Sequence, residues 1–149
     1  MPENRQYPAR PWLAVGVVVI AEERVLLIKR DRPPGMGQWT LPGGGVDTGE
    51  TLAAAAAREV LEETGITCHP MSVLTAVDHI TRDASGAAHY HYVIVDLLAH
   101  ATTTPPIARD DAADAGWFTL TEALALTHDD SLIAVLRQGF AAAPDAGEA

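Results

Sequence analysis

Cysteine, basic side chains and long apolar runs are all scarce in this chain of 149 residues. The single cysteine, Cys68, cannot form an internal disulfide, which excludes a disulfide scaffold and favours a reducing compartment. Acidic residues outnumber Lys and Arg by 20 to 10, and the net charge of −10 argues against non-specific binding to nucleic acid. The longest apolar run, Trp12 to Ala21, has about half the length of a membrane-spanning helix, and no signal-peptide core precedes it. These absences predict a cytoplasmic protein with neither nucleic-acid nor membrane partners.

The chain nevertheless has enough apolar residues, 48%, to build a core. Its length fits one domain, expected over residues 1–149, with flexible tails at about residues 1–10 and 141–149.

The order of the predicted elements indicates an α/β (α+β) fold, a mixed sheet with helices packed against it. Valine-rich runs predict strands, polar segments predict turns, and Thr51 and Gly65 mark the start and end of the clearest helix. The expected strands are 12–20, 25–29, 39–41, 71–82, 89–99 and 117–120, the expected helices are 51–64 and 131–140, and turns or loops are expected at 22–24, 31–38, 42–45 and 83–86.

Three glutamates stand at helical spacing in the segment 44–66, which reads GGVDTGETLAAAAAREVLEETGI. At about 100° per residue, Glu59, Glu62 and Glu63 fall on one face of the helix, and the opposite side is expected to pack onto the sheet. That opposite side comprises Ala53, Ala57, Val60 and Leu61. Such clusters are most often solvated acidic faces. Like charges this close destabilise a helix, however, and hard divalent cations that favour carboxylate oxygens would offset them.

The same segment resembles the signature of the Nudix hydrolase family, G-x5-E-x7-R-E-U-x-E-E-x-G-U, where U is a bulky aliphatic residue. Every specified position matches: Gly44, Glu50, Arg58, Glu59, Val60, Glu62, Glu63, Gly65 and Ile66. The predicted order of elements is also similar to the Nudix fold, in which a mixed curved β-sheet is sandwiched between helices.

The resemblance implies a metal-dependent pyrophosphohydrolase with Mg²⁺ or Mn²⁺ as cofactor. The ligands would be Glu59, Glu62, Glu63 and the backbone carbonyl of Gly43, and one of the glutamates would help to deprotonate the attacking water. Glu50 and Arg58 would form a supporting pair that fixes the loop against the helix.

A later acidic residue is also implied, because a loop carboxylate often precedes a tryptophan in this family. Asp111 is favoured as a further ligand or base among Asp110, Asp111 and Asp114, which all lie ahead of Trp117. Solvated loop aspartates are the commoner fate of such residues.

Substrate contacts are expected from Arg30 and Arg32, beside the loop 31–38, from Trp39, and from Gly44. Solvated surface charge or core packing is the ordinary role of such residues. The sequence leaves the roles of His89 and His91 open, and Asp96 faces either the site or solvent.

The substrate favoured by the resemblance is a small-molecule nucleotide, a nucleoside diphosphate linked to another group, such as ADP-ribose. A modified nucleoside triphosphate is the nearest alternative, and a non-catalytic nucleotide-sensing module is another. A homodimer is an option that the sequence leaves open.

Overall fold

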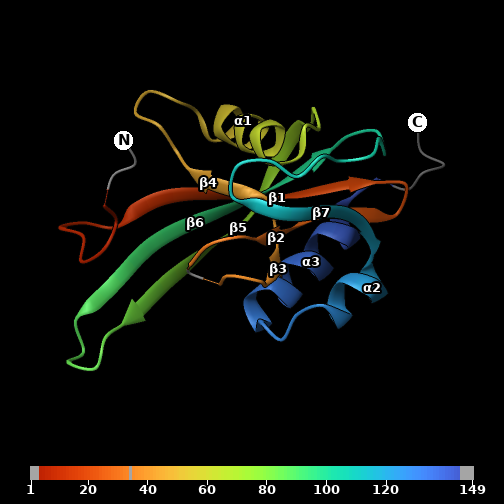
Figure 1. Cartoon of the computed structure of the whole chain (residues 1–149). Coiled ribbons are helices and arrows are strands. Elements are labelled where there is room, and N and C mark those ends of the chain that lie inside the picture. The colour runs from red at the N-terminus through yellow and green to blue at the C-terminus, as the bar shows by residue number, and fades with distance from the viewer. Residues whose placement is uncertain (1–3, 34, 145–149) are drawn as a thin grey trace.

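The computed structural model describes residues 4–33 and 35–144, and it confirms a mixed sheet flanked by helices (Figure 1). The tail residues 1–3 and 145–149, predicted to be flexible, lie outside the described residues. The strands are β1 (Trp12–Ala21), β2 (Arg24–Arg30), β3 (Trp39–Thr40), β4 (Gly43–Gly45), β5 (His69–Arg82), β6 (Ala88–His100) and β7 (Ala112–Thr119), and the helices are α1 (Leu52–Thr64), α2 (Leu120–Ala125) and α3 (Asp130–Ala142).

Strand β1 is the middle of the sheet, whose main path runs β3-β2-β1-β6-β5. It pairs in parallel with β6 from Trp12 to Ile20 and antiparallel with β4 from Ala14 to Gly16. The predicted hairpin of β1 and β2 exists only next to its turn, because just Ile20 and Ala21 pair with β2. Strand β2 then continues beside β7 and β3.

Side chains along β1 alternate between two apolar clusters, as the period of a strand requires. Val15, Val17 and Val19 pack under α1 in the first cluster. Val18 belongs to the second, with Leu132, Val135 and Leu136 of α3. Figure 1 shows α1 on one face of the sheet and α2 and α3 on the other.

Two segments differ from their predictions. The glycine-rich segment 42–45, expected to be a turn, contains β4, because a backbone without side chains can pair closely with β1. Strand β7 begins at Ala112, not at 117, and Leu120 starts α2. Helix α2 was not predicted, although its capping box of Thr119 and Glu122 is a readable start signal.

In the part of the chain that the structure describes, none of the helices is long and apolar enough to cross a membrane.

Candidate active site

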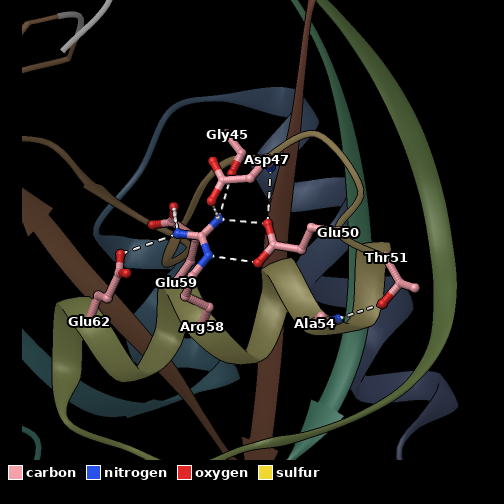
Figure 2. A network of polar contacts seen from close by, with 8 residues as sticks. All are labelled: Gly45, Asp47, Glu50, Thr51, Ala54, Arg58, Glu59 and Glu62. Atoms are coloured by element: carbon pink, nitrogen blue, oxygen red, sulfur yellow. Dashed lines mark hydrogen bonds and ion pairs between the residues drawn. The ribbon is translucent and has the colours of Figure 1, made fainter. Parts of the chain in front are cut away.

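Helix α1, which carries the glutamates, has a defined cap at each end. Thr51 caps its N-terminus by accepting a hydrogen bond from the Ala54 N–H at 3.0 Å, as Figure 2 shows. Gly65 ends it with a left-handed φ of 72° and donates to the Leu61 carbonyl at 2.9 Å. Only glycine adopts this left-handed backbone conformation at little energetic cost, so the helix ends directly after the glutamates.

The sheet-facing side of α1 is not the side predicted. Val60 is fully buried, but Leu61 is 47% exposed and Ala53 is exposed too. Glu63 instead is only 3% exposed, because three residues after Val60 the helix returns to the same face. A carboxylate therefore lies between α1 and the sheet, where the sequence pattern had placed an apolar surface.

Glu63 is tied to β4 by its side chain. One carboxylate oxygen accepts a hydrogen bond from the Gly43 N–H at 2.8 Å. Burial raises the pKa of Glu63 to about 8, and the negative charges of Glu59 and Asp111 add to this effect. The Gly43 N–H and the positive charge of Arg30 oppose it. The hydrogen bond and positive charge around Glu63 are thus too weak to offset the cost of ionising this buried carboxyl.

Arg58 is the hub of the polar network in Figure 2. Its Nε and Nη2 donate to the two oxygens of Glu50 at 2.7 and 2.9 Å, a bidentate contact, and Nη2 also donates to the Gly45 carbonyl at 2.9 Å. Nη1 donates to Glu59 at 2.9 Å and to Glu62 at 3.3 Å. Hydrogen bonds from Arg58 lower the pKa of Glu50 to about 2. The pair holds the loop that ends at Glu50 against α1.

Glu59 lies directly over Gly44. A methyl group on Gly44 would come within 2.6 Å of the Glu59 carboxyl carbon, so the absence of a side chain makes room for the carboxylate. Burial raises the pKa of Glu59, and the negative charges of Glu62 and Asp111 raise it further against the opposing effect of Arg58.

Replacing Gly44 by Ala is expected to weaken binding of divalent metal roughly 10- to 100-fold, because the added methyl displaces the Glu59 carboxylate. The measurement is activity as a function of Mg²⁺ or Mn²⁺ concentration, with the melting temperature recorded alongside. Unchanged metal affinity in a folded Gly44→Ala protein would contradict the role given to Glu59.

Asp111 lies close enough to raise the pKa values of Glu59 and Glu63. Its carboxylate is 3.1 Å from Arg32 Nε, and its carbonyl accepts from the Asp31 N–H at 2.9 Å. The loops before β3 and before β7 therefore meet beside α1. The loop before β7 sets the position of Asp111. This loop is fixed to α1 by the Arg109 N–H, which donates a hydrogen bond to the Glu63 carbonyl at 2.9 Å.

Arg30 and Trp39, which were also expected to touch substrate, and His89, whose role the sequence left open, lie in three different surroundings. Arg30 lies within electrostatic reach of Glu63, whose pKa its charge lowers. Trp39 packs edge-to-face on Phe118 at 5.1 Å between ring centroids and is half-buried beside the α3 cluster. His89 contacts the N-terminal segment instead, stacking on Tyr7 and lying 3.0 Å from Gln6.

The carboxylate and carbonyl oxygens of the predicted ligands are the kind of ligand that a hard divalent cation prefers. Their side chains, however, do not form a ready-made cluster around one point. In residues 4–33 and 35–144, no three His, Cys, Asp or Glu side chains already form a metal cluster. Glu59 and Glu62 both face Arg58, which offsets their charge. Glu62 is 45% exposed, so it can turn away from Arg58 at little cost. A cation among these oxygens would offset both causes of the raised pKa values of Glu59 and Glu63, which are burial first and the repulsion between carboxylates second.

Sequence reasoning missed one contributor to this region, Asp47, and one close contact on the α3 side of the sheet, between Gly16 and Asp96. The Asp47 carboxylate lies 3.7 Å from Arg58, and the Asp47 N–H donates to Glu50 at 3.0 Å. The sequence feature that could have identified Asp47 is its place in the loop, two residues after the glycines. Gly16 faces the buried Asp96 across β1 and β6, and no sequence signal identifies that pair. The burial of Asp96, 5% exposed, excludes the solvent-facing alternative.

The chain matches the model of the NUDIX domain over residues 10–138. The ADP-ribose pyrophosphatase of Methanocaldococcus jannaschii is 34% identical over 123 residues, which are 83% of this chain and 70% of that protein. The mouse oxidized purine nucleoside triphosphate hydrolase is 33% identical over 71% of this chain, which spans 65% of the mouse protein. The crystal structure of a MutT Nudix hydrolase from Burkholderia pseudomallei matches with a TM-score of 0.73 at 36% identity, covering 87% of this chain and 98% of that one.

This protein therefore belongs to the Nudix hydrolase family, whose members act on phosphoanhydrides. These relatives confirm the resemblance read from residues 44–66. Nudix hydrolases generally need divalent metal ions.

Proposed function

We propose that this chain hydrolyses the pyrophosphate bond of a nucleoside diphosphate linked to a second group, with ADP-ribose as the favoured substrate. The supporting observation is Glu63, buried beside Glu59 and Asp111 and bonded to the Gly43 N–H. The similarity to an archaeal ADP-ribose pyrophosphatase supports the choice of substrate.

In this proposal Glu59, Glu62, Glu63 and the Gly43 carbonyl hold the cations, Mg²⁺ or Mn²⁺. Bound cations would screen the phosphate charge, activate water and stabilise the leaving phosphate. The oxygens of these residues are the hard ligands that both ions prefer.

The protein itself supplies position and a proton acceptor. Arg58 and Glu50 fix the glycine-rich loop against α1, and the Gly43 N–H fixes the Glu63 side chain. One of three carboxylates, Glu59, Glu63 or Asp111, would accept the water's proton; the charges of these groups act on one another in the structure. Arg30 and Arg32 bring positive charge to the same edge, where they would face the substrate's phosphates. Positioning and electrostatics account for the rate, without a covalent intermediate.

The test is a hydrolysis screen with Mg²⁺ and with Mn²⁺ over ADP-ribose, other nucleoside diphosphate sugars, dinucleoside polyphosphates, and ordinary and oxidised deoxynucleoside triphosphates. We expect metal-dependent conversion of ADP-ribose to AMP and ribose 5-phosphate, abolished by EDTA. ADP-ribose left intact while another substrate is hydrolysed would overturn the choice of substrate.

A nucleoside triphosphate is the second candidate, because the mouse relative is named for such an activity at 33% identity. Release of pyrophosphate from an oxidised purine triphosphate, in preference to AMP from ADP-ribose, would identify it.

A further inference from the structure

Residues 101–111 connect β6 to β7 along the C-terminal end of α1, on the same side of the sheet as that helix (Figure 1). The Ile107 N–H donates to the Thr64 carbonyl at 2.9 Å. The Arg109 N–H donates to the Glu63 carbonyl at the same distance. Carbonyls in the last turn of a helix have no partner within the helix, so the loop satisfies two of them. The main chain of the loop is therefore fixed to the helix that carries the glutamates.

The loop ends in a tight turn from Arg109 to Ala112, whose N–H donates to the Arg109 carbonyl at 3.0 Å. Asp110 is the second residue of this turn, and its φ of 52° lies in the left-handed region. Turns with a positive φ at the second residue are dominated by Gly, Asn and Asp, because most other side chains clash with the backbone there. Asp111 is the third residue, so the direction of its side chain depends on the conformation of Asp110.

Asp111 lies beside the α1 glutamates directly after this left-handed residue. Its carbonyl accepts a hydrogen bond from the Asp31 N–H at 2.9 Å, which extends the pairing of β2 with β7 by one position. Its negative charge acts on both Glu59 and Glu63. The turn thus places a loop carboxylate within electrostatic reach of the helix carboxylates.

The side chain of Asp110 has no such surroundings. It is exposed, and within residues 4–33 and 35–144 no hydrogen bond or ion pair joins it to another residue. Its charge reaches only as far as Arg32, which is already paired with Asp31 and Asp111. The contribution of Asp110 to the site therefore lies in its backbone.

We propose that Asp110 is a positioning residue, whose left-handed backbone holds the Asp111 carboxylate at the α1 glutamates. This inference rests on the proposed function, in which Asp111 serves the hydrolysis as a metal ligand or as a base. Aspartate tolerates the left-handed conformation because its side chain is short and polar, and glycine adopts it freely. A β-branched side chain is strongly disfavoured there. A substitution at position 110 should therefore act through its backbone preference and not through its charge.

The test compares two substitutions that both remove the Asp110 charge. Asp110→Gly keeps the left-handed conformation, so kcat and Mn²⁺ affinity should stay within about twofold of wild type. Asp110→Val favours an extended backbone and should reproduce the loss seen in Asp111→Asn, roughly tenfold or more in kcat, in Mn²⁺ affinity or in both. The measurements are steady-state kinetics and, independently of turnover, titration with Mn²⁺ followed by electron paramagnetic resonance of the free ion.

Two controls separate positioning from a general loss of stability. Glu23 also has a left-handed backbone, with a φ of 62°, in the exposed turn between β1 and β2. Glu23→Val should lower the melting temperature, as Asp110→Val does, but leave kcat and Mn²⁺ affinity unchanged. The double variant of Asp110→Val with Asp111→Asn should be no worse than Asp111→Asn alone, because both substitutions remove the same interaction.

Three results would overturn the inference. Asp110→Gly as impaired as Asp111→Asn would show that the carboxylate of Asp110 is what matters. Wild-type kcat and Mn²⁺ affinity in a folded Asp110→Val protein would show that the turn positions nothing. Unchanged values in Asp111→Asn would remove the residue that is positioned, while the hydrolysis itself would stand.

Failure of the proposed substrate is kept separate, because the comparison uses whichever substrate is hydrolysed. With no turnover of any substrate, the Mn²⁺ affinities decide. The same loss in Asp110→Val and Asp111→Asn, absent in Asp110→Gly, supports the assignment. Equal Mn²⁺ affinity in all three variants overturns it.

Discussion

Glu63→Gln is expected to lower kcat for the proposed substrate roughly a thousandfold while leaving the fold intact. Glutamine has the shape of glutamate and can still accept the Gly43 N–H bond, which spans 2.8 Å in the structure. It cannot carry the charge that holds a divalent cation or accept the water's proton. Because burial makes the Glu63 charge costly, the metal-free variant should melt at least as high as the metal-free wild type.

The measurement is single-substrate kinetics at saturating Mg²⁺ and Mn²⁺, with thermal unfolding in EDTA. Glu23→Gln, on the exposed turn between β1 and β2, removes the same charge away from the site and should keep full activity. Turnover by Glu63→Gln within twofold of wild type would remove Glu63 from the reaction. A large drop in melting temperature would instead show that the carboxylate stabilises the α1–β4 contact.

The order of elements could be predicted from sequence because its signals are local. Thr51 and Gly65 mark the ends of α1 through capping and a left-handed φ, which depend on neighbours within the helix. The spacing of Glu59, Glu62 and Glu63 likewise predicted that they lie close together, since a helix places such positions on neighbouring faces. The family was predicted separately, from the match of residues 44–66 to its signature.

Burial of particular side chains could not be predicted, because it depends on what the rest of the chain places opposite them. Leu61 was expected inside and is 47% exposed, whereas Glu63 was expected on an acidic face and is 3% exposed. The pattern of charges predicted an acidic face on α1 but not how the helix is rotated against the sheet. Helices usually pack against a sheet through apolar side chains, and α1 departs from this by burying the carboxylate of Glu63. Such departures are expected at functional sites.

Contacts between distant segments were equally invisible in the sequence. Gly43 pairs with Gly16, and Gly16 with Asp96, across 27 and 80 positions that no local pattern connects. Asp111 reaches the same edge through the loop before β7, which was expected to start later. The site is therefore assembled by sheet topology around a helix that the sequence alone could identify.

Metal affinity is expected to rise about tenfold per pH unit between about pH 5 and pH 8 and to level off above that. In the metal-free protein the pKa of Glu63 is raised from 4.5 to about 8, so the group is mostly protonated at neutral pH. A cation binds only the ionised form, and binding therefore releases a proton. Mg²⁺ titrations in two buffers of different ionisation enthalpy count that proton directly.

Stability of the metal-free protein should move in the opposite direction over the same window. A carboxyl whose folded pKa is raised contributes stability that is complete below its unfolded pKa, near 4.5, and is lost as pH rises to about 8. The loss has an upper limit of about 1.4 kcal/mol per pH unit. Glu63→Gln cannot titrate there, so its melting temperature in EDTA should fall less steeply from pH 5.5 to 8.5. Parallel slopes for the variant and the wild type would show that Glu63 ionises normally and that another carboxylate governs metal binding.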